Sequence, residues 1–153
     1  MNLKERIAVM MAAVAACGSI TFAYQKPNTQ NEKSQGKQDQ PAAVEFITAE
    51  ELKAKIAKNE PLAILDLRAE SAYSQSDKTI KGSLHTKVRK VVTRLRDAPR
   101  DKEVITYCAC PSDEAAAIAA RSLMASGFKR VRVLKGGWNA WVQAGGQMER
   151  RPL

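Results

Sequence analysis

The chain has 153 residues, enough for one domain of ordinary size, and its 25 Lys and Arg residues exceed its 16 Asp and Glu residues by nine. Hydrophobic residues make up 44% of the sequence, which excludes a wholly disordered protein, whereas 5% aromatic residues argue against a stacking platform for single-stranded nucleic acid. Three cysteines are too few for a disulfide-stapled scaffold, and a single histidine excludes a His-rich metal site.

The first segment, residues 1–23, has the pattern of an export signal, in which a short positive region precedes the uncharged run 7–16. Three outcomes of processing fit it. A bacterial lipobox ending at Cys17 would make this cysteine the lipidated mature N-terminus. Cleavage after Ala23 would release an ordinary signal peptide, and an uncleaved 7–24 would serve as an anchor slightly shorter than a usual membrane span. Each outcome predicts an exported domain that is periplasmic or membrane-associated.

The next segment, residues 24–42, is expected to be a flexible tether. Its stretch 25–41 contains no large apolar residue, so it cannot bury enough surface to offset the entropy lost on ordering. Residues 43–153 then form the folded domain. This domain carries most of the positive charge, which selects no particular partner, and no nucleic-acid partner is expected.

Predicted strands and helices alternate through the domain. Strands are expected at 44–47, 62–67, 104–108 and 130–134, and helices from a capping box at Thr48 and Glu51 to about Lys58, at 86–96, from Ser112 to Gly127, and after Gly136-Gly137. Residues 70–83 are polar and irregular. The alternation favours an α/β fold with a parallel central sheet and helices on both faces, in which ligands bind at the carboxyl ends of the strands.

The segment Cys108-Ala109-Cys110-Pro111-Ser112-Asp113-Glu114 connects such a strand end to the start of a helix. Backbone N–H groups turned inward, together with the positive end of the helix, favour a thiolate over a thiol. Cys108 is therefore the candidate nucleophile, and the same loop could hold an anionic sulfur donor. Ser112 is expected to cap the helix, whose inner face would carry Ala115, Ile118, Ala119 and Leu123.

Four motifs in the expected order give residues 44–150 a resemblance to single-domain rhodaneses, the thiosulfate sulfurtransferase-like family. They are Ile47-Thr48-Ala49-Glu50-Glu51-Leu52, then Leu65-Asp66-Leu67-Arg68 followed by Tyr73, then Tyr107-Cys108 before an Ala-rich helix, and finally Leu134-Lys135-Gly136-Gly137-Trp138-Asn139-Ala140-Trp141. The last motif is the most specific. The resemblance implies a compact α/β domain that needs no cofactor.

The same resemblance implies that Cys108 accepts a sulfane sulfur as a persulfide and passes it to a thiol, including a protein acceptor, or to cyanide. It places Asp66 and Arg68 near the loop as supporting residues, where Arg68 could pair with Asp66 or Glu114. Trp138 would form a wall of the pocket, and Trp141 belongs to the core. His85 is expected to be a hydrogen-bonded structural residue and not a base.

The cysteine loop departs from the family pattern in a way that changes the expected chemistry. No residue from 109 to 120 is basic, and Asp113 and Glu114 are expected near the rim, which predicts weak thiosulfate activity or another donor. Related phosphatases use Cys-x-x-x-x-x-Arg, but Glu114 takes the arginine position and would repel phosphate. The sequence therefore favours a sulfurtransferase over a phosphatase.

Several alternatives stay open. The acidic loop also fits a non-catalytic rhodanese-fold module that binds a partner in the envelope. Cys110 could form a disulfide with Cys108, resolve a persulfide, relay sulfur, or have no role. Two cysteines and a distant His85 do not supply the four ligands of a zinc site. The basic side chains of 86–96 are expected to face solvent, with docking to an acidic partner or anionic lipid as the alternative.

Overall fold

The computed structural model describes residues 43–152. The strands are β1 (Glu45–Ile47), β2 (Leu62–Asp66), β3 (Lys78–Ile80), β4 (Ser83–His85), β5 (Glu103–Tyr107), β6 (Val131–Leu134) and β7 (Met148–Arg150). The helices are α1 (Ala49–Ala57), α2 (Glu70–Ser74), α3 (Val91–Arg94), α4 (Glu114–Ala125) and α5 (Gly137–Gln143), and a 3₁₀ turn, η1 (Val88–Lys90), precedes α3. The predicted signal 1–23, the tether 24–42 and Cys17 lie outside the described residues.

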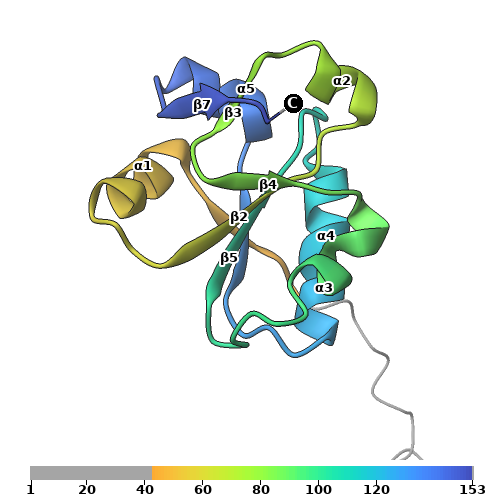
Figure 1. The fold of residues 1–153 in the computed structure, drawn as a ribbon. Coiled ribbons are helices and arrows are strands. Elements are labelled where there is room, and N and C mark those ends of the chain that lie inside the picture. Colours follow the sequence, from red (N-terminus) through yellow and green to blue (C-terminus); the bar gives the residue numbers. More distant parts are fainter. Residues whose placement is uncertain (1–42, 153) are drawn as a thin grey trace, which may run out of the picture. The chain divides into compact units, whose positions relative to one another are not determined.

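Five strands form a parallel sheet in the order β1-β6-β5-β2-β4, and β3 pairs with β7 in a separate antiparallel ribbon. Figure 1 shows α1 on one side of the sheet and α3 with α4 on the other. This confirms the predicted α/β architecture. The central strand β5 is buried along its whole length, as expected for a strand covered on both faces.

The core has two halves because successive side chains of a strand point to opposite faces of the sheet. Along β5, Val104 packs in the cluster under α3 and α4, while Ile105 and Tyr107 pack in the cluster with α1 and α5. Cys108 belongs to the first cluster. Trp141 is fully buried in the second, which confirms its predicted place in the core.

The capping box at the start of α1 is present as predicted. The Glu51 N–H donates to Thr48 Oγ1, and the Thr48 N–H donates to the Glu51 carboxylate. Two of the N–H groups that a helix start leaves without partners are thereby satisfied. The cap fixes where the chain leaves β1.

Two predicted stretches differ from the structure. Residues 70–83, expected to be irregular, contain α2, β3 and the start of β4. Residues 86–96, expected to form one helix, contain the short η1 and α3, neither of which has a side-chain cap. The β-branched run from Val91 to Thr93 weakens helix propagation there. Val91 and Leu95 are nevertheless buried, at the spacing of one turn of a helix.

The start of α4 also differs from the prediction. Ser112 is exposed, and Asp113, with φ of 53°, is the residue that precedes the helix. The buried face of α4 consists of Ala116, Ala119, Ala120 and Leu123, while Ile118 is 42% exposed. The expected inner face was thus correct for Ala119 and Leu123 and in part for Ala115, which is half-buried and packs against the core. It was wrong for Ile118, which lies on the solvent side of α4.

At the opposite end of the sheet from the cysteine loop, Glu103 is buried at the start of β5 and accepts hydrogen bonds from Lys55, Arg130 and Arg132. Burial acts to raise the pKa of Glu103, but the hydrogen bonds from Arg132 and Lys55 outweigh it, and this pKa lies below its usual value. A carboxylate whose pKa is depressed in the folded state stabilises the fold above the unfolded-state pKa.

We therefore expect Glu103 to contribute stability that is complete above its unfolded pKa of about 4.3 and is lost as the pH falls through its lower folded pKa. Glu103→Gln should lower the free energy of unfolding by about 1–3 kcal/mol at pH 7 and make it less dependent on pH in acid. Urea titrations at several pH values measure both effects. An unchanged acid dependence in the variant would show that other groups carry it.

Candidate active site

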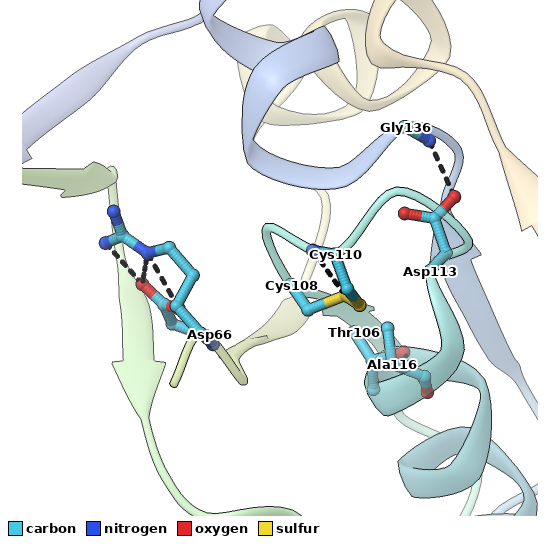
Figure 2. The surroundings of a disulfide bond; sticks show 8 residues. Asp66, Thr106, Cys108, Cys110, Asp113, Ala116 and Gly136 are labelled. Carbon is cyan, nitrogen blue, oxygen red and sulfur yellow. Dashed lines mark hydrogen bonds and ion pairs between the residues drawn. A yellow bond between two sulfur atoms is a disulfide. The ribbon is translucent and has the colours of Figure 1, made fainter. Parts of the chain in front are cut away.

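The loop between β5 and α4 contains the two cysteines of the described domain (Figure 2). Cys108 is 2% exposed, and its Sγ is joined to Cys110 Sγ in a disulfide. The Cys110 N–H also points to Cys108 Sγ at a nitrogen–sulfur distance of 3.4 Å. Cys110 is half-buried, so it is the more accessible of the two sulfur-bearing residues.

The turn before α5 holds the loop in place. The Trp138 N–H donates to the Cys108 carbonyl at 2.8 Å. The Gly136 N–H donates to the Asp113 carboxylate at 2.8 Å, a bond that Figure 2 shows. Gly137 has φ of +49°, and a Cβ there would lie 2.1 Å from the Cys108 carbonyl oxygen. Only glycine fits this position without moving one of the two segments.

The sequence predicted Asp113 near the rim of the site, but the structure places it elsewhere. It is 6% exposed, and its carboxylate points to the Gly136 turn, so it helps to position the loop. The chain reverses at Pro111 and Ser112, and αL backbone at Asp113 turns the carboxylate inward. Glu114, Pro111 and Ser112 are exposed, and Ala109 is half-buried.

Asp66 lies at the end of β2 and is fully buried. Its carboxylate accepts hydrogen bonds from the Arg68 guanidinium, with Nη2 at 2.6 Å, from the Tyr107 hydroxyl at 2.6 Å and from the Thr79 hydroxyl at 3.1 Å. Burial acts to raise the pKa of Asp66, but the hydrogen bonds from Arg68 and Tyr107 outweigh it and the pKa is lowered. Burial and the nearby Asp66 raise the pKa of Tyr107, which stays a phenol.

Arg68 is 3% exposed, and its guanidinium carbon lies 4.2 Å from the Trp138 ring centroid and 5.1 Å from that of Tyr73. It pairs with Asp66 and not with Glu114. Trp138 thus packs on the Asp66–Arg68 pair and is absent from the lining of the pocket beside Cys108, in contrast to the expectation. The arrangement favours a scaffolding role for all three residues.

A pocket of about 480 Å³ opens beside the disulfide. Its lining includes Cys108, Ala109 and Cys110 from the loop, and three basic residues, Arg68, His85 and Lys87. Glu70 adds the opposite charge. The sequence interpretation missed Lys87 here, because it assigned the basic residues of 86–96 to solvent. Lys87 reaches the pocket because it follows β4, whose end lies beside the end of β2 in the parallel sheet.

His85 differs from the expected hydrogen-bonded structural residue. Its Nδ1 is buried without a hydrogen-bond partner and lies 3.8 Å from Asp66, and its Nε2 lies 3.7 Å from Glu70. The ring stacks on Tyr73 with centroids 3.7 Å apart. Stacking, rather than hydrogen bonding, fixes this side chain at the edge of the pocket.

Comparison with known proteins matches residues 48–144, more than half of the chain, to the model of the rhodanese-like domain. The chain belongs to the rhodanese-like domain family. A sulfurtransferase of Allochromatium vinosum is 29% identical over 102 residues, which cover 67% of this chain and 92% of the relative. A candidate sulfur carrier protein of Bacillus subtilis, YrkF, is 29% identical over 66% of this chain, and the match spans 52% of YrkF, about half its length.

Among solved structures, the Alr3790 protein from Anabaena is 32% identical, with a TM-score of 0.60 over 69% of this chain and 82% of that one. The family and its sulfurtransferase relative indicate sulfur transfer as the role at family level. Within the described part of this rhodanese-like domain, no helix is long and apolar enough to span a membrane, and no three His, Cys, Asp or Glu side chains are grouped to hold a metal.

Proposed function

We propose that the domain is a sulfurtransferase that carries sulfane sulfur as a persulfide on Cys108. The observation that supports this most strongly is the position of Cys108. It follows the central strand, it is one of the residues that line the pocket, and the turn before α5 fixes its loop. A nucleophile held by rigid elements at the carboxyl end of a parallel sheet is in the usual place for chemistry in this architecture.

The reaction begins from the reduced loop, because the disulfide occupies the sulfur that must attack. The Cys108 thiolate attacks the sulfane sulfur of the donor, and the sulfur–sulfur bond of the donor breaks. With thiosulfate, sulfite leaves and Cys108 holds the persulfide. Cyanide or a thiolate then takes the outer sulfur, and the Cys108 thiolate is restored. The Cys110 N–H, 3.4 Å from Cys108 Sγ, lies where it can donate to the thiolate.

The pocket supplies positive charge that the loop itself lacks. Lys87 and Arg68 line it, with His85 at its edge and Glu70 as the opposing carboxylate. Arg68 is already paired with Asp66, so Lys87 is the cation available to an anionic donor. This replaces the expectation that Asp113 repels the donor, since its carboxylate is turned away from the pocket and hydrogen-bonded.

Lys87→Ala is expected to raise the KM for thiosulfate about two- to fivefold with kcat nearly unchanged, because an exposed charge interaction contributes about 1 kcal/mol or less to binding the dianion. Lys90→Ala is the matched control, since Lys90 is also exposed but lies outside the pocket lining. Initial rates over a range of thiosulfate at low salt measure both. Equal KM values in the two variants would contradict a binding role for Lys87.

The function is tested by incubating the reduced chain with thiosulfate or glutathione persulfide and measuring intact mass. Cys110→Ser simplifies the readout, because only Cys108 then remains in the loop. The expected product gains one sulfur atom on the Cys108 peptide and loses it on addition of cyanide. If no donor adds sulfur and Cys108→Ser leaves the biological role intact, the domain is a partner-binding module of the same fold.

We also propose that the chain is exported and that Cys17 is a lipidation site, on the basis of the pattern in residues 1–23. A lipid on Cys17 would hold the domain at a membrane through the polar segment 24–42. The intact mass of the mature protein from its native host distinguishes a lipidated Cys17 from cleavage after Ala23 and from an unprocessed chain. Only the first of these masses supports lipidation.

A further inference from the structure

We propose that Cys110 resolves the persulfide on Cys108 and so gives the domain a second activity, the release of hydrogen sulfide with formation of the Cys108–Cys110 disulfide. This inference rests on the proposed function, because it needs sulfur to reach Cys108 first. The product of the step is the form that the structure contains, with the two sulfur atoms bonded to each other. The domain then works as a persulfide reductase as well as a carrier.

The backbone of the loop allows the two sulfurs to meet. The Cα atoms of Cys108 and Cys110 are 5.7 Å apart, which is within the range of ordinary disulfides. The Trp138 N–H donates to the Cys108 carbonyl in the same structure, so the bonded form does not require the loop to leave its support. Resolution therefore needs side-chain movement within a loop that stays anchored.

Access to the inner sulfur of the persulfide favours Cys110 over any external thiol. The inner sulfur is Cys108 Sγ, on a residue that is only 2% exposed, whereas Cys110 is half-buried and next to the pocket. A thiol from solvent meets the outer sulfur and removes it by transfer. Cys110 is bonded to the inner sulfur in the structure and attacks as an intramolecular group of high effective concentration.

The electron balance of the step is complete. The Cys110 thiolate attacks Cys108 Sγ, the bond between the inner and outer sulfur breaks, and hydrosulfide leaves and takes up a proton. Hydrosulfide is a weaker base than an ordinary cysteine thiolate, which makes it the better leaving group. The outer sulfur is reduced to sulfide, and the two cysteines are oxidised to the disulfide.

An external dithiol resets the site. It attacks Cys110 Sγ, the sulfur of the more exposed residue, releases the Cys108 thiolate, and is itself oxidised to a disulfide. With thiosulfate as donor, the full cycle converts thiosulfate and a dithiol into sulfite, hydrogen sulfide and the oxidised dithiol. In this cycle the sulfur leaves as hydrogen sulfide, so no acceptor for sulfur is needed. The dithiol supplies the two electrons.

The test is a single turnover of the full chain, reduced and then freed of reductant, with a stoichiometric amount of thiosulfate or glutathione persulfide. The wild type should release one sulfide per chain and end two hydrogen atoms lighter through the loop disulfide. Cys110→Ser should retain the added sulfur and release sulfide at least about tenfold more slowly. Cys17→Ser is the matched control, a cysteine removed outside the loop, and should behave as the wild type.

Each outcome separates the two proposals. If the persulfide has the same lifetime in Cys110→Ser and in the wild type, Cys110 is not a resolving cysteine, and the transfer function stands. A mass gain found on Cys110 of the wild type would make it a relay and also overturn the inference. If Cys110→Ser gains no sulfur from either donor, the transfer function itself fails.

Discussion

Cys108→Ser is expected to lower the rate of thiocyanate formation from thiosulfate and cyanide by at least about a thousandfold, or about 4 kcal/mol of transition-state stabilisation. A serine hydroxyl is not ionised at neutral pH, and His85, the single histidine of the sequence, makes no hydrogen bond with Cys108 that could activate it. The replacement removes one sulfur atom from a loop whose hydrogen bonds run through the backbone, so the fold should survive. The measurement compares the initial rates of thiocyanate formation by the wild type and by Cys108→Ser, both reduced beforehand.

Cys110→Ser is the matched variant for this measurement, because it makes the same chemical change two residues away. It should retain thiocyanate formation at the wild-type rate or above, since the persulfide that it keeps remains available to cyanide. Circular dichroism and thermal unfolding of both variants exclude a loss of fold. If Cys108→Ser forms thiocyanate as fast as the wild type, another group carries out the sulfur transfer.

Asp66→Ala is expected to lower the free energy of unfolding by about 3–5 kcal/mol, because it leaves the charge of Arg68 without its partner inside the protein. Both side chains are fully buried, and the Tyr107 and Thr79 hydroxyls lose their acceptor as well. For a domain of this size, such a loss is a large share of the total stability. Urea unfolding followed by Trp fluorescence measures it.

Asp97→Ala is the control for this prediction, since Asp97 also pairs with an arginine, Arg96, but both side chains are exposed. Its removal should change the free energy of unfolding by about 0.5 kcal/mol or less. A loss at Asp66 as small as that at Asp97 would mean that Arg68 finds another partner or reaches water. The difference between the two variants isolates the effect of burial.

The sequence predicts those parts of the fold that local pattern determines. The apolar runs at 62–67 and 104–108 predict β2 and β5, and with them the position of Cys108 at a strand end. Thr48 and Glu51 predict the start of α1, since the cap needs only residues three positions apart. The ribbon of β3 and β7 was missed because all three residues of β7 are exposed and its pairing depends on a partner far along the chain.

The same limit explains the errors at the site. The sequence places Asp113 near Cys108 but cannot show that its carboxylate binds Gly136, 23 residues later. Lys87 reaches the pocket because β4 pairs beside β2, and no spacing within 78–90 reveals that pairing. The pairing of Asp66 with Arg68 was among the expected alternatives, because the two residues are only two positions apart in the sequence. The packing of Trp138 on Arg68 depends on the tertiary structure and could not be predicted.

The order of the strands in the sheet has a consequence for how the domain folds. Among the neighbours in the five-stranded sheet, only β5 and β6 are consecutive strands of the described chain, and Glu45 pairs with Arg132, 87 positions away. Pairing of distant segments makes folding slow, because each long loop must close before its contacts form. The surroundings of Cys108 come from β2, β5 and the turn after β6, so they are complete only when β2, β5 and β6 have met. Until then the newly made chain exposes its thiols to any oxidant in its compartment.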